Sequence, residues 1–271
     1  MSVPSSAHGP EPPPGPSADR GPASPPGPSA GAAADPFIAA ASLEGIPSAY
    51  AATRDGIDSL LRDRGLRRTT PQDTARALLL GAAATAGLEG SDNDPDVLAE
   101  GGGDATARGA VRLSTELLGL LPVWNRAPLQ ALARLHSLAA AGSVADEDLG
   151  RPVHAAGVAR LSELARLVAL PTQAPGLVVA ALVHAEVVAA GAFVSHNGVV
   201  ARAAERLVTV AKGVDPASVT VPEAGHAAAP QGYRAALAAY ERGDAPGVTQ
   251  WLNYGAQAFA RAAEASPLAT G

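Results

Sequence analysis

Residues 176–212 read GLVVAALVHAEVVAAGAFVSHNGVVARAAERLVTVAK, and this stretch decides the fold class. Its apolar first part, Gly176–Ala192, comes closest in the chain to a membrane span, but a spanning helix needs about 20 apolar residues. His184 and Glu186 also interrupt the apolar run. The pattern therefore predicts a helix buried in a protein core over residues 175–190.

A tight polar turn, Phe193–Gly198, follows the apolar run and leads into a second predicted helix that ends near Lys212. Backbone N–H groups at the start of a helix point toward the preceding turn, where they can bind an anion. The turn therefore has two interpretations. It is a plain helix start with Asn197 as the N-cap, or it is an anion site built from Asn197 and the N–H groups of Gly198 and Val199.

The remainder of the chain also has the composition of helices. Ala, Leu, Arg and Glu dominate nearly every segment, and alternating runs of β-branched and aromatic residues do not occur. Thr70, Pro71 and Asp73 form a helix-start signal, with Thr70 as the N-cap. The sequence therefore predicts an all-α protein. Further helices are expected over residues 46–63, with a stop near Gly65, and over residues 70–88, 96–99, 104–120, 128–141, 155–170, 230–239 and 247–265.

Composition divides the chain and excludes several classes of site. Residues 1–34 are rich in proline and poor in large apolar side chains, which predicts a disordered tail. We expect N-terminal helices over residues 35–100 and a helical core over residues 101–271. The chain has no cysteine, which excludes disulfides, thiolate metal sites and cysteine nucleophiles.

Charge and targeting signals narrow the choice of partners. The net charge of −6 gives no reason to expect nucleic acid as a partner. Neither an apolar segment of spanning length nor an N-terminal signal peptide is recognised, so we expect a soluble cytoplasmic protein without a membrane partner. His184 is expected to be a core histidine. No role is assigned to His136, to His154 or to His226, which is expected in a loop.

The order of motifs around the turn resembles the core of the Fic (Fido) family. That family's signature is HPFx[DE]GNGRxxR, and Phe193, Asn197, Gly198 and Arg202 match its Phe, its Asn-Gly pair and its last Arg. A looser resemblance covers about residues 45–265. The resemblance implies a Fic-like helical bundle, and it implies ATP and Mg²⁺ as the cofactors that active members use.

A second match lies upstream of the core. Residues 85–90 read TAGLEG and fit the [ST]xxxE[GN] pattern of the family's inhibitory helix. In family members that inhibit themselves in this way, the Glu of this motif pairs with the last Arg of the signature. The resemblance therefore implies a regulatory ion pair between Glu89 and Arg202.

Several positions depart from the family signature. Gly191 stands at the catalytic His, Ala192 at the Pro, Ser195 at the metal-binding acid, His196 at the first Gly and Val199 at the phosphate-binding Arg. Glycine has no proton acceptor in its side chain, and the loss of a general base alone costs about 10²- to 10⁴-fold in rate. We therefore do not expect an active AMP transferase, and no residue is expected to bind a metal.

Three functions remain open from the sequence. The first is a catalytically degenerate Fic-fold protein that acts as a binding or regulatory module, with a residual nucleotide or phosphate site at Asn197, Gly198 and Val199. The second is a divergent nucleotidyl (AMP) transferase that modifies protein hydroxyls, with His196 or a group of the substrate as the substitute base. The third is a structural all-α oligomer without a ligand. The expected partners are a nucleotide, another protein or a second copy of the chain.

Overall fold

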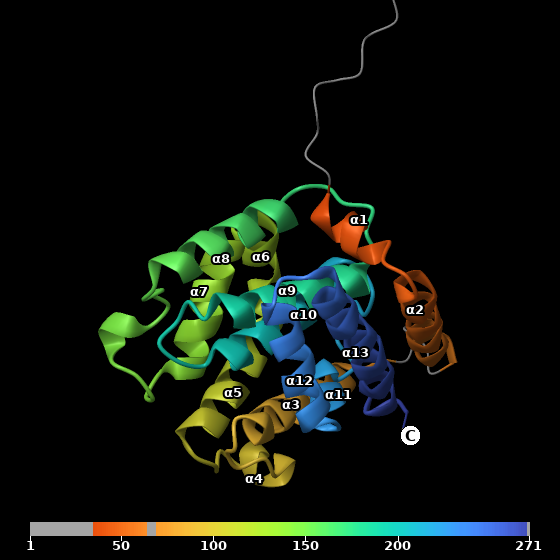
Figure 1. Cartoon of the computed structure of the whole chain (residues 1–271). Helices are drawn as coiled ribbons and strands as arrows, with labels where there is room; N and C mark the ends of the chain where they lie inside the picture. Colours follow the sequence, from red (N-terminus) through yellow and green to blue (C-terminus); the bar gives the residue numbers. More distant parts are fainter. Residues whose placement is uncertain (1–34, 64–68, 270–271) are drawn as a thin grey trace, which may run out of the picture. The chain divides into compact units, whose positions relative to one another are not determined.

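The computed structural model describes residues 35–63 and 69–269, and every regular element in these residues is a helix (Figure 1). The all-α class predicted from the sequence is confirmed. The α-helices are α1 (Pro36–Ala41), α2 (Ile46–Asp63), α3 (Pro71–Leu88), α4 (Pro95–Ala99), α5 (Ala105–Glu116), α6 (Leu121–Arg126), α7 (Pro128–Ala140), α8 (Ala155–Val168), α9 (Gly176–Ala190), α10 (Asn197–Ala211), α11 (Pro222–Ala227), α12 (Pro230–Glu241) and α13 (Ala245–Glu264). Two 3₁₀ helices, η1 (Leu117–Leu120) and η2 (Asp146–Asp148), lie among them.

The boundaries of α2 and α3 follow the local signals in the sequence. α2 covers the predicted residues 46–63, and α3 ends at Leu88 as predicted. The start of α3 is a capping box. Thr70 Oγ1 accepts a hydrogen bond from the N–H of Asp73 at 3.2 Å, and the Asp73 carboxylate accepts one from the N–H of Thr70 at 2.8 Å. These reciprocal bonds satisfy two of the N–H groups that a helix start leaves unpaired.

Three short helices, α1, α6 and α11, were not predicted from the sequence. Each is six residues long and carries a proline in its first turn. So short a helix is unstable by itself and depends on packing, which local patterns do not reveal. α11 packs against α3 and α13. The prediction that His226 lies in a loop is wrong, because His226 is a buried residue of α11.

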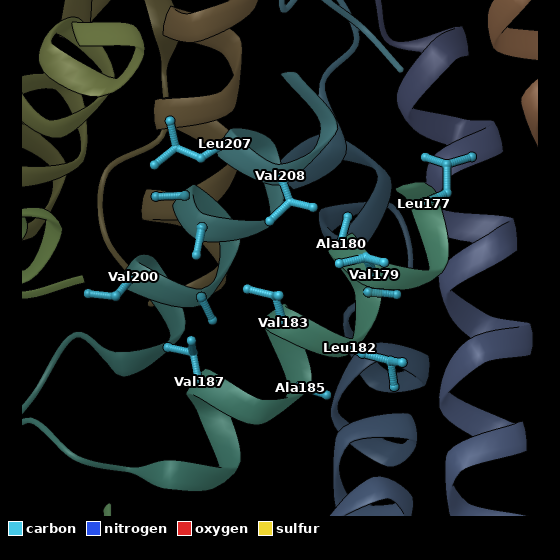
Figure 2. Close-up of a cluster of buried hydrophobic side chains, with 14 of the residues drawn as sticks. Leu177, Val179, Ala180, Leu182, Val183, Ala185, Val187, Val200, Leu207 and Val208 are labelled. Atoms are coloured by element: carbon cyan, nitrogen blue, oxygen red, sulfur yellow. The ribbon is translucent and has the colours of Figure 1, made fainter. Parts of the chain in front are cut away.

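The core is centred on α9 and α10, which pack against each other (Figure 1). α9 also contacts α8 and α13, and α10 contacts α7. Ten of the fifteen residues of α9 are buried, so this helix is covered on all sides as a helix without a polar face must be. Figure 2 shows the apolar side chains that fill the space around the two helices, Val183, Val187 and Val200 among them.

The chain forms one compact unit from Asp35 onward. The predicted tail over residues 1–34 and the predicted helix stop near Gly65 lie outside the described residues. The predicted division at residue 100 stays a prediction. In the part of the chain that the structure describes, no helix combines the length and the apolar character that crossing a bilayer requires.

Candidate functional site

The turn between α9 and α10 is closed by the side chain of Asn197. Its Oδ1 accepts a hydrogen bond from the N–H of Phe193 at 3.0 Å, and its Nδ2 donates to the Phe193 carbonyl at 2.8 Å. His196 is the N-cap of α10, with a φ of 57° in the left-handed region, and Asn197 is the first helical residue. The prediction of Asn197 as the N-cap is wrong by one position, because its side chain bonds backward to the loop.

A carboxylate from the end of α3 lies at the start of α10. Glu89 is the C-cap of α3, and a Cβ added to Gly198 would stand 2.9 Å from Glu89 Oε1. The same oxygen accepts a hydrogen bond from Arg202 Nη2 at 2.5 Å. The unpaired N–H groups and the dipole at a helix N-terminus stabilise a nearby anion. Glu89 therefore places a carboxylate beside the start of α10, where its hydrogen bond is with Arg202.

Val199 and His196, the other two residues predicted for the site, are both engaged in contacts within the protein. Val199 is buried, and its side chain belongs to the apolar core. His196 Nδ1 lies 2.7 Å from Ser195 Oγ, and its Nε2 is buried without a hydrogen-bond partner. Burial lowers the pKa of His196, although the charge of Glu89 partly opposes this shift. The imidazole is therefore mainly neutral at pH 7.

Arg202 is buried and connects the turn to the centre of the molecule. Its Nε donates a hydrogen bond to Thr85 Oγ1 at 3.2 Å, and its Nη1 donates one to the hydroxyl of Tyr233 at 3.2 Å. That hydroxyl lies 2.7 Å from His184 Nε2. A continuous hydrogen-bonded path thus runs from Glu89 through Arg202 and Tyr233 to His184.

Three buried polar side chains meet where α9, α10 and α11 come together. His226 Nε2 lies 2.8 Å from Glu205 Oε2, and His184 Nδ1 lies 3.1 Å from the same oxygen. All three side chains are fully buried, and we refer to them as the buried triad. The interpretation of His184 as a core histidine is correct. Glu205 and His226 were missed, because they are 21 residues apart and only the packing of α10 against α11 brings them together.

The surroundings of the buried triad favour an ionised carboxylate. Burial alone would raise the pKa of Glu205, but the neighbouring imidazoles of His226 and His184 lower it to about 2. Burial lowers the pKa of His184 to about 4, against the opposing effect of the Glu205 charge. At neutral pH, Glu205 is therefore a carboxylate and His184 is a neutral imidazole.

A further buried ion pair lies on the same helix. Arg206 Nε and Nη2 donate to the two carboxylate oxygens of Glu223 at 2.9 and 2.5 Å, a bidentate arrangement. Arg206 Nη1 also donates to Ser218 Oγ at 3.0 Å. Gly81 of α3 allows this close approach, because a Cβ there would stand 2.7 Å from Arg206 Nη2. The pair joins α10 to α11 inside the core.

A cavity of about 370 Å³ lies among α1, α8, α9, α12 and α13. Its lining is mainly apolar, with Arg160, Glu186 and Tyr240 among its polar residues. Arg160 donates to Glu186 Oε2 at 2.6 Å, and the Tyr240 hydroxyl donates to Glu186 Oε1. These polar groups satisfy one another, so the cavity offers a ligand mainly apolar contact.

No protein-family model matches this chain, and no curated protein is significantly similar to it in sequence. The resemblance to the Fic family therefore rests on the residues quoted above and stays a prediction.

Proposed function

We propose that this protein is a catalytically degenerate Fic-like module that acts in binding or regulation, with Glu89 as the internal ligand of an anion site at the start of α10. The observation that carries the proposal is the position of Glu89 Oε1 against both Gly198 and Arg202. A phosphate group has the same sign of charge and strong acceptor oxygens. It would compete with Glu89 for the same guanidinium and for the space beside Gly198.

The local geometry favours binding over group transfer. Gly191 is the C-cap of α9 with a φ of 50°, a conformation in which glycine is preferred, and it supplies no general base. Ser195 offers a neutral hydroxyl that already contacts His196, in place of the carboxylate that Mg²⁺ prefers. With neither a base nor a metal-binding acid at these positions, a bound phosphate donor would not be activated.

Titrations of the full chain with ATP, GTP and CTP, with and without Mg²⁺, test this proposal by calorimetry and thermal shift. The informative variant is Glu89→Gln, which keeps the shape of the side chain and removes its charge. We expect at least one nucleotide to bind Glu89→Gln about tenfold more tightly than the wild type or better, because the competing carboxylate is gone.

Glu100→Gln is a matched control. Glu100 is the C-cap of α4, with backbone angles close to those of Glu89 at the end of α3, and its side chain is exposed. This control should bind nucleotides as the wild type does. Absence of binding by the wild type and by Glu89→Gln would contradict the proposal and favour a structural role. A nucleotide-dependent mass increase of the protein or of a lysate, lost in His196→Ala, would favour the transferase.

A further inference from the structure

The buried triad has the donor atoms of a metal site. His184 Nδ1, His226 Nε2 and one Glu205 carboxylate oxygen all lie within 4.8 Å of one another. Two imidazoles with one carboxylate form a donor set that binds first-row divalent ions such as Zn²⁺ and Fe²⁺. The three residues come from α9, α10 and α11, so a bound ion would join three elements of the core.

The donor atoms of the triad are close enough to share one ion, and hydrogen bonds do not satisfy all of them. Both imidazole nitrogens approach Glu205 Oε2, at 2.8 and 3.1 Å, yet His184 Nδ1 has no hydrogen-bond partner. Donor atoms around a tetrahedral ion with bonds of about 2.0–2.1 Å are separated by about 3.3 Å. The second carboxylate oxygen, Glu205 Oε1, is also buried without a hydrogen-bond partner.

Two tyrosine hydroxyls contact the imidazole nitrogens that face away from Glu205. The hydroxyl of Tyr233 lies 2.7 Å from His184 Nε2, and the hydroxyl of Tyr254 lies 3.1 Å from His226 Nδ1. These contacts leave the other nitrogen of each ring directed at Glu205. Histidines that bind metals are held in this way, with the remote ring nitrogen hydrogen-bonded to an oxygen.

The buried charges around α10 are unequally compensated. Arg202 pairs with Glu89, and Arg206 pairs with Glu223. Among the described residues, the ion-pair contacts of Glu205 are with the two histidines alone. A buried carboxylate is very costly unless a positive charge compensates it, and a bound cation supplies that charge.

We propose that His184, Glu205 and His226 bind one divalent first-row transition-metal ion, with the Glu205 carboxylate as a bidentate ligand. Two nitrogens and two oxygens complete a four-coordinate shell, which is distorted from a tetrahedron because the two oxygens of one carboxylate lie closer together than tetrahedral donor atoms do. The ion is structural, because all three side chains are fully buried and no coordination position is left for a substrate. Since the site is closed in the folded protein, the ion enters during folding.

The test is a refolding experiment on the full chain, made without a polyhistidine tag. The protein is unfolded in guanidinium chloride with EDTA, freed of chelator, and refolded alone, with Zn²⁺, or with Co²⁺ as a spectroscopic probe. We expect one ion per chain by elemental analysis, visible d–d absorption of four-coordinate Co²⁺, and a higher Tm than that of protein refolded without metal. Refolded wild type that retains no ion would overturn the proposal and leave a hydrogen-bonded triad balanced by a proton.

Variants show whether the ion sits in the triad. His226→Gln and Glu205→Gln should lose the ion and the Co²⁺ spectrum, whereas His154→Gln should keep both, because His154 is an exposed histidine outside the triad. Retention of the ion by both triad variants would contradict the assignment. If these variants do not fold, the metal affinity of Tyr254→Phe tests the site instead. This substitution removes only a supporting hydroxyl and should weaken metal affinity by about 10- to 100-fold, and an unchanged affinity would count against the site.

Discussion

α9 and α10 follow each other in the chain, have fifteen residues each and pack together, yet they are buried by different means. α9 is apolar on nearly every side and fills the core with Leu, Val and Ala. α10 carries Arg202, Glu205 and Arg206, whose side chains are all buried. α9 is therefore buried through apolar area almost alone, whereas α10 adds three buried charged side chains to its buried apolar residues.

The two helices therefore gain their stability from different interactions. Apolar residues of α9 gain free energy wherever they leave water, whatever their neighbours are. The charged residues of α10 are tolerated only because other elements bring partners: Glu89 follows α3, and Glu223 lies in α11. Variants of α9 should therefore respond to lost volume, and variants of α10 should respond to the presence of a partner.

The largest effect is expected from Arg206→Ala. Removing one member of the buried pair leaves Glu223 charged and unpaired, which should lower the free energy of unfolding by about 3–5 kcal/mol. Denaturant unfolding followed by circular dichroism measures the change. Replacing both partners with apolar residues, Arg206→Met with Glu223→Leu, should cost less than Arg206→Ala alone. Additive losses in the double variant would show that α10 does not depend on pairing.

Leu177→Ala tests the apolar helix in the same measurement. Leu177 is 2% exposed, and its truncation should lower the free energy of unfolding by about 2–5 kcal/mol, through lost burial and a residual cavity. Leu170→Ala serves as the control. Leu170 is 49% exposed, so this change should stay within about 0.5 kcal/mol. Equal effects at the two positions would contradict the assignment of α9 to the core.

The turn between α9 and α10 contacts His136 of α7, and this histidine should make the free energy of unfolding depend on pH. This ring stacks on Phe193 with centroids 4.3 Å apart, and burial, with a smaller effect of His196, lowers its pKa from 6.5 to about 4. Between these two values the unfolded chain binds more protons than the folded protein. The free energy of unfolding should therefore fall by about 1–3 kcal/mol as the pH decreases from about 6.5 to about 4.

Chemical denaturation at several pH values, on the wild type and on His136→Gln, measures this contribution. Gln can still accept the hydrogen bond that the N–H of Gly150 donates to His136 Nδ1 at 2.9 Å. The variant should therefore lose less stability than the wild type over the same pH range. Identical pH profiles would assign the acid sensitivity to other groups.

The smallest effect is expected from Arg166→Ala. Arg166 pairs with Glu163 at 2.6 Å on the surface of α8, where both side chains are more than half exposed. Water and salt screen such a pair, so its loss should cost about 0–1 kcal/mol. Comparing the free energies of unfolding of Arg166→Ala and Arg206→Ala, measured in one denaturation series, isolates the effect of burial on an Arg–Glu contact. A loss as large as that of Arg206→Ala would be incompatible with this explanation.

Much of the fold followed from local sequence. Thr70 and Asp73 predicted the start of α3, and the apolar run before Gly191 predicted α9. α1, α6 and α11 were not predicted, although the shorter α4 was, because six residues carry little periodic signal and the local start signal Asp35–Pro36 was not used. For the candidate site, the motif led to Glu89 and Arg202, and the structure contains a contact between them. The sequence could not predict that the Asn197 side chain bonds the backbone of Phe193, because these hydrogen bonds depend on the path of the loop.

The sequence by itself determined that the protein is helical, where helices such as α2 and α3 lie, and that Gly191 supplies no base; the helix expected over residues 104–120 instead ends at Glu116 and continues as η1. These properties depend on residue type and on neighbours a few positions away. Only the tertiary structure decided that Glu89 meets Gly198 and that Glu205 meets two histidines. Contacts between distant residues arise from the packing of whole helices, and α10 looks like a surface helix until the partners of its charges are known.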